Sequence, residues 1–234
     1  MEIKLTKKPK NPIIIEGFPG LGLIATISTE YLIKHLNATS IGYIWSKNLL
    51  PIAAVHDNKV IQPLELYYAE KENILIVHAL SDVRGLEWEI GEALVKLYDM
   101  LKAKEIITVE GIMSKSESNN VYAYCSNQQK RKKFETLQVQ ALKEGIIMGV
   151  TASLLLKNNK SNVTGLFVES HSSLPDSKSA AKIIEVLNNY LSLNIDIKPL
   201  ISAAEKFEQK LKSILEQSKQ AREFKRAKEL NYLG

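Results

Sequence analysis

Ile13-Ile14-Ile15 leads into the glycine-rich turn Gly17-Phe18-Pro19-Gly20-Leu21-Gly22. The three isoleucines are too short a run for anything but a buried strand. Beyond the turn, apolar residues recur at helical spacing and predict a helix; they are Leu21, Ile24, Ile27, Tyr31, Leu32 and Leu36. A strand, a tight turn and a helix in this order are typical of α/β proteins, where the turn either binds an anion or packs the first helix against the first strand.

The turn matches neither of the common phosphate-binding motifs. A Walker loop needs Gly-Lys followed by Ser or Thr, but Gly22 is followed by Leu23. A dinucleotide fingerprint has the order G-x-G-x-x-G with an acid about 20 residues later. This turn has the order G-x-x-G-x-G, and residues 40–46 contain no acid. Because Pro19 also removes one backbone N–H, we interpret this segment as a structural turn built on Gly17, Pro19, Gly20 and Gly22.

The composition is that of an ordinary soluble globular protein. The 234 residues are 45% apolar and 24% charged, enough for one α/β domain or for one domain with an appendage. No apolar run approaches the ~20 residues that span a bilayer, so no membrane partner is expected. The single cysteine, Cys125, excludes an internal disulfide and suits a cytoplasmic location.

The net charge of +5 is concentrated at the two ends of the chain. Residues 1–12 hold four lysines and one glutamate, and residues 200–234 hold eight basic and five acidic side chains. The body between them is therefore close to neutral. This distribution is not typical of a dedicated nucleic-acid-binding fold, so a nucleic-acid partner is not expected.

Local patterns predict the secondary structure. Helices are predicted from about Gly85 and over residues 151–156, and Asp176 is placed to cap a third helix. Residues 114–133, which are rich in Ser, Asn, Gln and Lys, are predicted to form a surface excursion with a short hairpin. Short β-branched or alternating runs predict strands near residues 12–16, 39–46, 51–56, 59–69, 73–79, 105–111 and 163–170.

This order of elements predicts an α/β fold with a single domain. Strands that alternate with helices pair in parallel, so we expect a mostly parallel sheet flanked by helices on both faces. We place the core domain at residues 1–199, a C-terminal helix at 200–217 and a basic tail at 218–234. The helix carries a heptad seam of just over two repeats, suited to oligomerisation or helix packing; its residues are Leu200, Ala204, Phe207, Leu211 and Ile214.

Residues with catalytic chemistry do not form a recognised constellation. The four histidines lack metal-ligand spacing, so no metal site is predicted. There is no Gly-x-Ser-x-Gly elbow. Glu169-Ser170-His171 followed by Asp176 is either a general base with an orienting carboxylate or a polar loop in which Asp176 caps the next helix. No partner nucleophile is identified, so we favour the polar loop and predict neither an enzyme nor a cofactor.

Three stretches occur in an order that resembles the family named after proteasome assembly chaperone 2, in its archaeal branch. They cover nearly the whole body, and the long C-terminal helix matches too. The stretches are Glu16-Gly17-Phe18-Pro19-Gly20-Leu21-Gly22-Leu23-Ile24, then Gly145-Ile146-Ile147-Met148-Gly149-Val150-Thr151-Ala152-Ser153-Leu154-Leu155, then Gly165 through Val168-Glu169-Ser170 and Pro175-Asp176 to the helix at 183–193.

The resemblance implies a phosphorylase/hydrolase-like α/β fold without enzymatic activity. It also implies a homo-oligomer that binds the α-subunit ring of the proteasome core particle. The best understood relatives insert a C-terminal tail of the pattern hydrophobic-tyrosine-any between α subunits. Here the tyrosine lies one position earlier than in that pattern. The resemblance then places partner binding at Leu230, Tyr232, Leu233 and Gly234.

Two other functions stay open at this stage. A ligand-binding protein or an enzyme would use the phosphorylase-like cleft for a nucleoside or a phosphate, with Gly20, Arg84, Glu110 and Glu169 near it. An RNA-binding protein would use the basic run 130–133, although we interpret that run as a solvated loop. RNA affinity would then fall steeply with salt. Neither alternative has a motif of its own, so we favour the proteasome adaptor.

Overall fold

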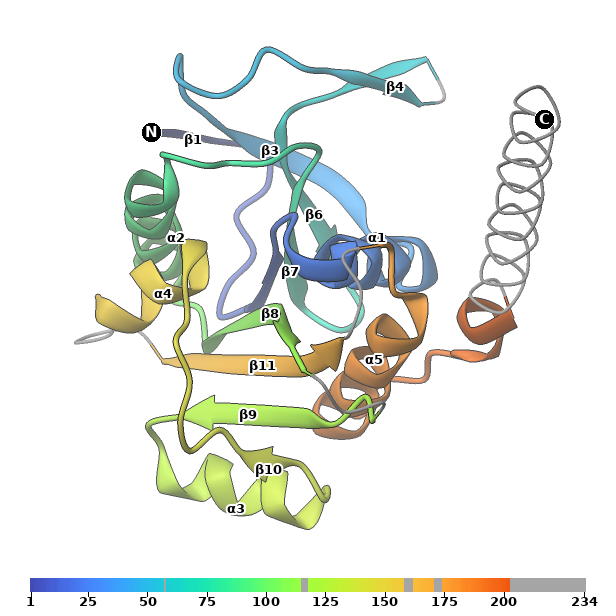
Figure 1. Ribbon diagram of the computed structural model, residues 1–234. Coiled ribbons are helices and arrows are strands. Elements are labelled where there is room, and N and C mark those ends of the chain that lie inside the picture. Colours follow the sequence, from blue (N-terminus) through green and yellow to red (C-terminus); the bar gives the residue numbers. More distant parts are fainter. Residues whose placement is uncertain (57, 115–117, 158–161, 171–173, 203–234) are drawn as a thin grey trace, which may run out of the picture. The chain divides into compact units, whose positions relative to one another are not determined.

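The computed structural model describes residues 1–56, 58–114, 118–157, 162–170 and 174–202 (Figure 1). The chain divides into two compact units, Met1–Ile195 and Asp196–Gly234. In the second unit the described residues are 196–202, of which 198–202 are helical. Within the described ranges, no helix is both long enough and apolar enough to cross a membrane.

A large sheet forms the centre of the first unit (Figure 1). In the described part of the chain its order is β1-β3-β6-β7-β2-β8-β11-β9-β10. Beside it, β4 (Ala54–His56) and β5 (Lys59–Ile61) form a separate two-stranded sheet. The strands of the large sheet are β1 (Glu2–Leu5), β2 (Ile13–Gly17), β3 (Thr39–Trp45), β6 (Leu64–Ala69), β7 (Ile74–Ala79), β8 (Glu105–Met113), β9 (Val121–Cys125), β10 (Gln140–Ala141) and β11 (Val163–Ser170).

The large sheet is mixed. Its centre, β7-β2-β8-β11, is parallel. The strands β1, β3, β6 and β7 pair antiparallel, and β9 pairs antiparallel with β11 but parallel with β10. A tight connection such as residues 70–73, between β6 and β7, joins only antiparallel neighbours. The predicted α/β class is confirmed, with a mixed sheet whose parallel pairing lies mainly in the centre.

Helices cover both faces of the sheet. On one face, α1 (Ile24–His35) contacts β2 and α5 (Ser177–Leu191) contacts β11. On the other face, α2 (Glu87–Leu101) packs against α4 (Gly149–Leu156), which contacts β8 and β11. A Cβ added to Gly91 of α2 would lie 2.1 Å from Ser153 Oγ of α4, so these two helices approach closely because Gly91 has no side chain.

The core on the α2 and α4 side is one continuous cluster. It joins Ile14 of β2 and Ile106 of β8 to Leu94 of α2 and Leu154 of α4. All four side chains are fully buried. Their positions follow from the sequence, since alternate strand residues face the same side and helical residues three to four apart share one stripe. This packing fixes α4 beside the strands that carry the carboxylates described below.

The segment after β8 differs from its prediction. Residues 121–125 form β9 inside the large sheet, paired with β11, whereas the sequence predicted a surface excursion with a short hairpin. The helix α3 (Gln128–Thr136) follows and contacts β9 and β10. Its residue Phe134 is buried and stacks on Tyr190, with ring centroids 4.5 Å apart. The polar residues on either side of this strand led to the prediction of a surface excursion. Buried Ala123 and Cys125 alternate with exposed Tyr124, as expected for a half-buried strand.

Candidate functional site at the carboxyl ends of the parallel strands

The glycine-rich turn follows the carboxyl end of β2, at the sheet edge where α/β proteins bind ligands. A Cβ added to Gly17 would lie 2.6 Å from the carbonyl oxygen of Ala25, so α1 packs directly on this position. Gly22 has φ +62°, a backbone conformation that favours glycine. Its carbonyl oxygen accepts a hydrogen bond of 2.8 Å from the backbone N–H of Asp176. The structural role of the turn stays a prediction, which substitution of Gly17 by alanine would test.

Two carboxylates and a hydroxyl meet beneath this turn. Glu110 Oε1 of β8 accepts a 2.9 Å hydrogen bond from Thr151 Oγ1, in the first turn of α4. Glu16 Oε1 of β2 lies 3.5 Å from the same hydroxyl, and Glu16 is 1% exposed. A Cβ added to Gly20 would lie 3.4 Å from Glu110 Oε2, an ordinary contact, which brings the predicted residues Gly20 and Glu110 together.

Burial dominates the electrostatics of these two acids. It raises the pKa of Glu110 to about 7, against the hydrogen bond from Thr151, which acts to lower it. Burial first, and the charge of Glu110 second, raise the pKa of Glu16 well above its usual value. Glu16 therefore keeps its proton at neutral pH, whereas Glu110 is about half protonated there. Sequence reasoning did not single out Glu16; its signal is an acid that directly follows three strand isoleucines.

Glu169, at the carboxyl end of β11, is held by donors from a neighbouring segment. Its carboxylate accepts hydrogen bonds from Ser118 Oγ (2.9 Å), Ser114 Oγ (3.1 Å) and Tyr122 Oη (3.2 Å). Desolvation acts to raise the pKa of Glu169, but these donors outweigh it and lower the pKa overall. This carboxylate is therefore ionised at neutral pH and holds Ser114, Ser118 and Tyr122 against β11.

The polar loop after β11 caps the first turn of α5, as its sequence predicted. Asp176 Oδ1 accepts a 2.9 Å hydrogen bond from the backbone N–H of Ser179, which caps the helix. Asp176 Oδ2 accepts 2.7 Å and 2.8 Å bonds from the hydroxyls of Ser170 and Ser179. His171 lies outside the described residues. The cap therefore uses the carboxylate that a catalytic interpretation assigned to orienting a base.

The remaining cleft residue, Arg84, forms an ion pair with Asp82. Its side chain is 89% exposed. Glu110 accepts its hydrogen bond from Thr151, and Glu169 accepts bonds from Ser114 and Ser118, so none of these bonds involves Arg84. Among the described residues, no group of three or more His, Cys, Asp or Glu side chains is arranged to hold a metal ion.

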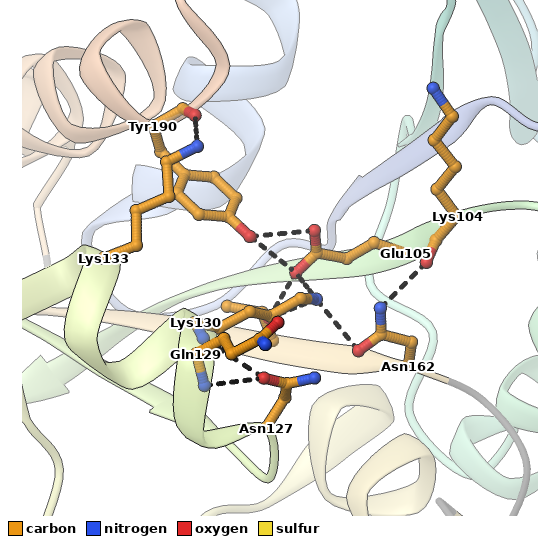
Figure 2. A network of polar contacts seen from close by, with 9 residues as sticks. Lys104, Glu105, Asn127, Gln129, Lys130, Lys133, Asn162 and Tyr190 are labelled. Atoms are coloured by element: carbon orange, nitrogen blue, oxygen red, sulfur yellow. Dashed lines mark hydrogen bonds and ion pairs between the residues drawn. The ribbon is translucent and has the colours of Figure 1, made fainter.

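The basic run 130–133 lies in α3 rather than in a solvated loop, and most of its side chains bind within the fold. Figure 2 shows Lys130 directed toward Glu105, with Tyr190 and Asn162 on either side. Lys130 Nζ forms an ion pair with Glu105 and donates a 2.9 Å hydrogen bond to Asn162 Oδ1. Lys133 Nζ donates a 2.7 Å bond to the carbonyl oxygen of Tyr190. The interpretation of this run as a solvated loop is therefore wrong.

Three further residues complete this part of the molecule. Arg131 donates hydrogen bonds to the carbonyl oxygens of Cys125 (3.1 Å) and Ser126 (3.0 Å), so three basic side chains of the run are engaged within the protein. Burial raises the pKa of the Cys125 thiol, which makes it a poor nucleophile. Burial first, and the charge of Glu105 second, raise the pKa of Tyr190, so its phenol remains a donor to Glu105.

A hollow of about 490 Å³ lies elsewhere, in the segment between β3 and β6. Residues 45–47, 49–53 and 62–63 line it, and none of the carboxylates described above is among them. Several of its apolar side chains are exposed, including Trp45 and Leu50. This hollow is therefore separate from the edge of the sheet where the predicted cleft residues lie.

The predicted partner-binding and seam residues lie mostly beyond the described part of the chain. Leu200 belongs to the helical residues 198–202 and is buried. The other predicted residues, which are outside the described ranges, are Ala204, Phe207, Leu211, Ile214, Leu230, Tyr232, Leu233 and Gly234.

Comparisons with known proteins agree over most of the chain. The model of the PAC2 family matches residues 14–215. The uncharacterized protein MJ0106 of Methanocaldococcus jannaschii is 32% identical over 226 residues, covering 92% of each chain. Among solved structures, PbaA of Pyrococcus furiosus, an archaeal homolog of proteasome-assembly chaperone, has a TM-score of 0.84 at 31% identity, covering 95% of each chain.

A second structure from Pyrococcus furiosus has the same fold. PbaB, an archaeal proteasome activator, has a TM-score of 0.78 at 23% identity, covering 91% of this chain and 98% of its own. The family match spans the glycine-rich turn, all the parallel strands and the helices on both faces. On sequence and fold together, the chain belongs to the PAC2 family.

Proposed function

We propose that this protein is a non-enzymatic proteasome chaperone or adaptor. In this proposal it forms a homo-oligomer and binds the α-subunit ring of the proteasome core particle through residues 230–234. The observation that carries the proposal is the membership in the PAC2 family over residues 14–215, together with the 31% identity to PbaA, an archaeal homolog of proteasome-assembly chaperone. The fold shared with PbaB, an archaeal proteasome activator, points in the same direction.

The use of the carboxylates within the fold supports a non-enzymatic role. Glu110 is bonded to Thr151, Glu169 accepts bonds from three side-chain hydroxyls, and Asp176 caps α5. A catalytic acid or base needs to reach a substrate proton within hydrogen-bond distance. These side chains are instead committed to contacts that hold strands and helices together.

The composition of the last residues supports binding through this segment. Tyr232 offers a large, rigid side chain that loses little conformational entropy when it enters a pocket, and Leu230 and Leu233 add apolar area. The preceding residues 219–228 carry five basic and one acidic side chain. A basic segment of this kind accelerates association with an acidic surface at low salt.

A titration of the cognate α-subunit ring by biolayer interferometry tests this proposal. The full-length protein is expected to bind, and deletion of residues 230–234 is expected to abolish binding. Tyr232→Ala should weaken binding about 30-fold, the loss of one anchor worth about 2 kcal/mol. Tyr124→Ala, which changes a tyrosine exposed on the body, is the matched control and should bind like the wild type.

The proposal fails if the deletion binds as tightly as the full-length protein, or if neither binds the ring. Light scattering coupled to size exclusion, run on the same samples, measures the oligomer. If the deletion variant remains oligomeric but no longer binds the α-subunit ring, residues 230–234 are responsible for the binding. A monomer in every sample contradicts the homo-oligomer.

A further inference from the structure

Glu16, Glu110 and Thr151 come together on the face of the sheet that α2 and α4 cover. Glu16 pairs in register with Thr108, two positions before Glu110 on β8, and residues two apart on a strand share a face. The Thr151 hydroxyl lies 2.9 Å from Glu110 Oε1 and 3.5 Å from Glu16 Oε1. Two strands and the first turn of a helix are thus joined by three polar side chains.

The three side chains offer too few hydrogen-bond donors to stabilise two ionised carboxylates. The Thr151 hydroxyl has one proton, which its bond to Glu110 uses. The 3.5 Å separation from Glu16 is longer than an ordinary O–H···O hydrogen bond, and Glu16 is 1% exposed. Because an ionised carboxylate is strongly disfavoured when it is buried without a donor, Glu16 keeps its own proton and the pair carries at most one charge.

Other charged groups lie on the elements that adjoin these three side chains. Glu105 of β8 faces α5, and His78 of β7 pairs in register with Gly17 and bonds to Thr29 of α1. Glu169 of β11 is bonded to Ser114 and Ser118. The charged residues of α2 and of the end of α4 are Glu87, Glu89, Glu92, Lys96, Asp99 and Lys157, and Lys157 pairs with Glu92.

We propose that Glu16, Thr151 and Glu110 form a proton-dependent latch between the first turn of α4 and the sheet. While both acids hold their protons, Thr151 bridges helix and strand. When Glu110 ionises, its buried charge has a single donor, and movement of the turn away from β8 lets water solvate it. Ile146 and Met148, which lead into this turn, are 93% and 77% exposed, whereas Val150 within the turn is buried, so the open state is expected to be a minor population that separates the turn from the core.

Proton linkage gives the size of the effect. In the closed latch the pKa of Glu110 is about 7, compared with 4.5 for a freely solvated glutamate. A group that releases its proton more readily in the open state makes opening more favourable as the pH rises. Between about pH 6 and about pH 8.5 the opening equilibrium constant is therefore expected to rise about tenfold.

Hydrogen–deuterium exchange of the full-length protein tests the latch. The readout is the protection of peptides from residues 142–156, corrected for the intrinsic pH dependence of exchange. The wild type should lose about tenfold in protection over this pH range. Glu110→Gln, which keeps an acceptor for Thr151 but has no charge, should lose none. Glu169→Gln, an acid at the same sheet edge outside the latch, should behave like the wild type.

The proposal is overturned if wild-type protection does not change with pH, or if Glu110→Gln keeps the full pH response. Thr151→Val provides a second test, because it removes the bridging hydroxyl while preserving the shape of the side chain. In this variant, protection of α4 at the lower pH should fall to the wild-type value at the higher pH. A Thr151→Val variant with the wild-type response also overturns the latch.

Discussion

Replacing Lys130 by Met tests how α3 is attached to the sheet. Lys130 of α3 is paired with Glu105 of β8, and their side chains are only 16% and 6% exposed. Met has nearly the same length and flexibility, so the substitution removes the charge with little change in packing. It leaves Glu105 as a buried carboxylate without its cation.

The magnitude follows from what remains around Glu105. Breaking a buried ion pair by removing one partner typically costs about 3–5 kcal/mol, because the other charge stays uncompensated. Tyr190 Oη still donates to Glu105 Oε2 over 3.0 Å, and Thr164 Oγ1 still donates to Oε1. These two donors place the expected loss at the lower end, about 3 kcal/mol in the free energy of unfolding. For a chain of this size that corresponds to a melting temperature lowered by roughly 6–12 °C.

Urea titrations followed by circular dichroism measure the effect, with Lys132→Met on the exposed side of the same helix as the control. The control is expected to stay within about 0.5 kcal/mol of the wild type. The double variant Lys130→Met with Glu105→Gln removes both charges and should regain most of the loss. A Lys130→Met variant within about 1 kcal/mol of the wild type would falsify the assignment of a buried ion pair. The ion pair is also contradicted if the loss of unfolding free energy in the double variant equals the sum of the losses in the two single variants.

Three further predictions use the same equilibrium measurements. Gly17→Ala should cost about 3 kcal/mol because of overpacking, since its Cβ would lie 2.6 Å from the Ala25 carbonyl, while Gly20→Ala, with a nearest contact of 3.4 Å, should be nearly neutral. Burial lowers the pKa of His78 from 6.5 to about 4. The contribution of His78 to the unfolding free energy should therefore be fully retained above about pH 6.5 and fall by up to about 3 kcal/mol as the pH drops to about 4, which the difference between the wild type and a variant without His78 measures. His78→Asn should lose that dependence, and an unchanged acid profile in this variant would contradict it. Asp176→Ala should cost about 1–2 kcal/mol through loss of the α5 cap, and Asp82→Ala, on an exposed ion pair, is its control.

Elements with strong local signals were predictable from the sequence. The isoleucine run at 13–15, the strand at 163–170 and the helix capped by Asp176 each follow from a pattern within a few residues, and the structure confirms them. The strand order was not predictable in the same way. Whether a strand pairs in parallel depends on partners far along the chain, and β9 enters the sheet beside β11, about 40 residues later.

The candidate site, like the strand order, depends on contacts between residues that are far apart in the sequence. Glu110 and Gly20 were expected near one another, and they are in contact distance. Glu16 was missed because Thr151, which lies beside its carboxylate, belongs to a helix far along the sequence. Lys130 was expected in solvent because nothing near it in the sequence reveals Glu105 as its partner. Residues 230–234 remain a prediction that rests on the family.

The position of β2 between β7 and β8 has a consequence for synthesis on the ribosome. Ile13 pairs with Ile74 on one side and with Glu105 on the other, so the first apolar strand to emerge receives its neighbours much later. At ordinary translation rates of roughly 5–20 residues per second, both edges of β2 stay unpaired for several seconds. An apolar strand with open edges is prone to pair with other chains. We therefore expect the nascent chain to need protection by general chaperones until β7 and β8 have been synthesised.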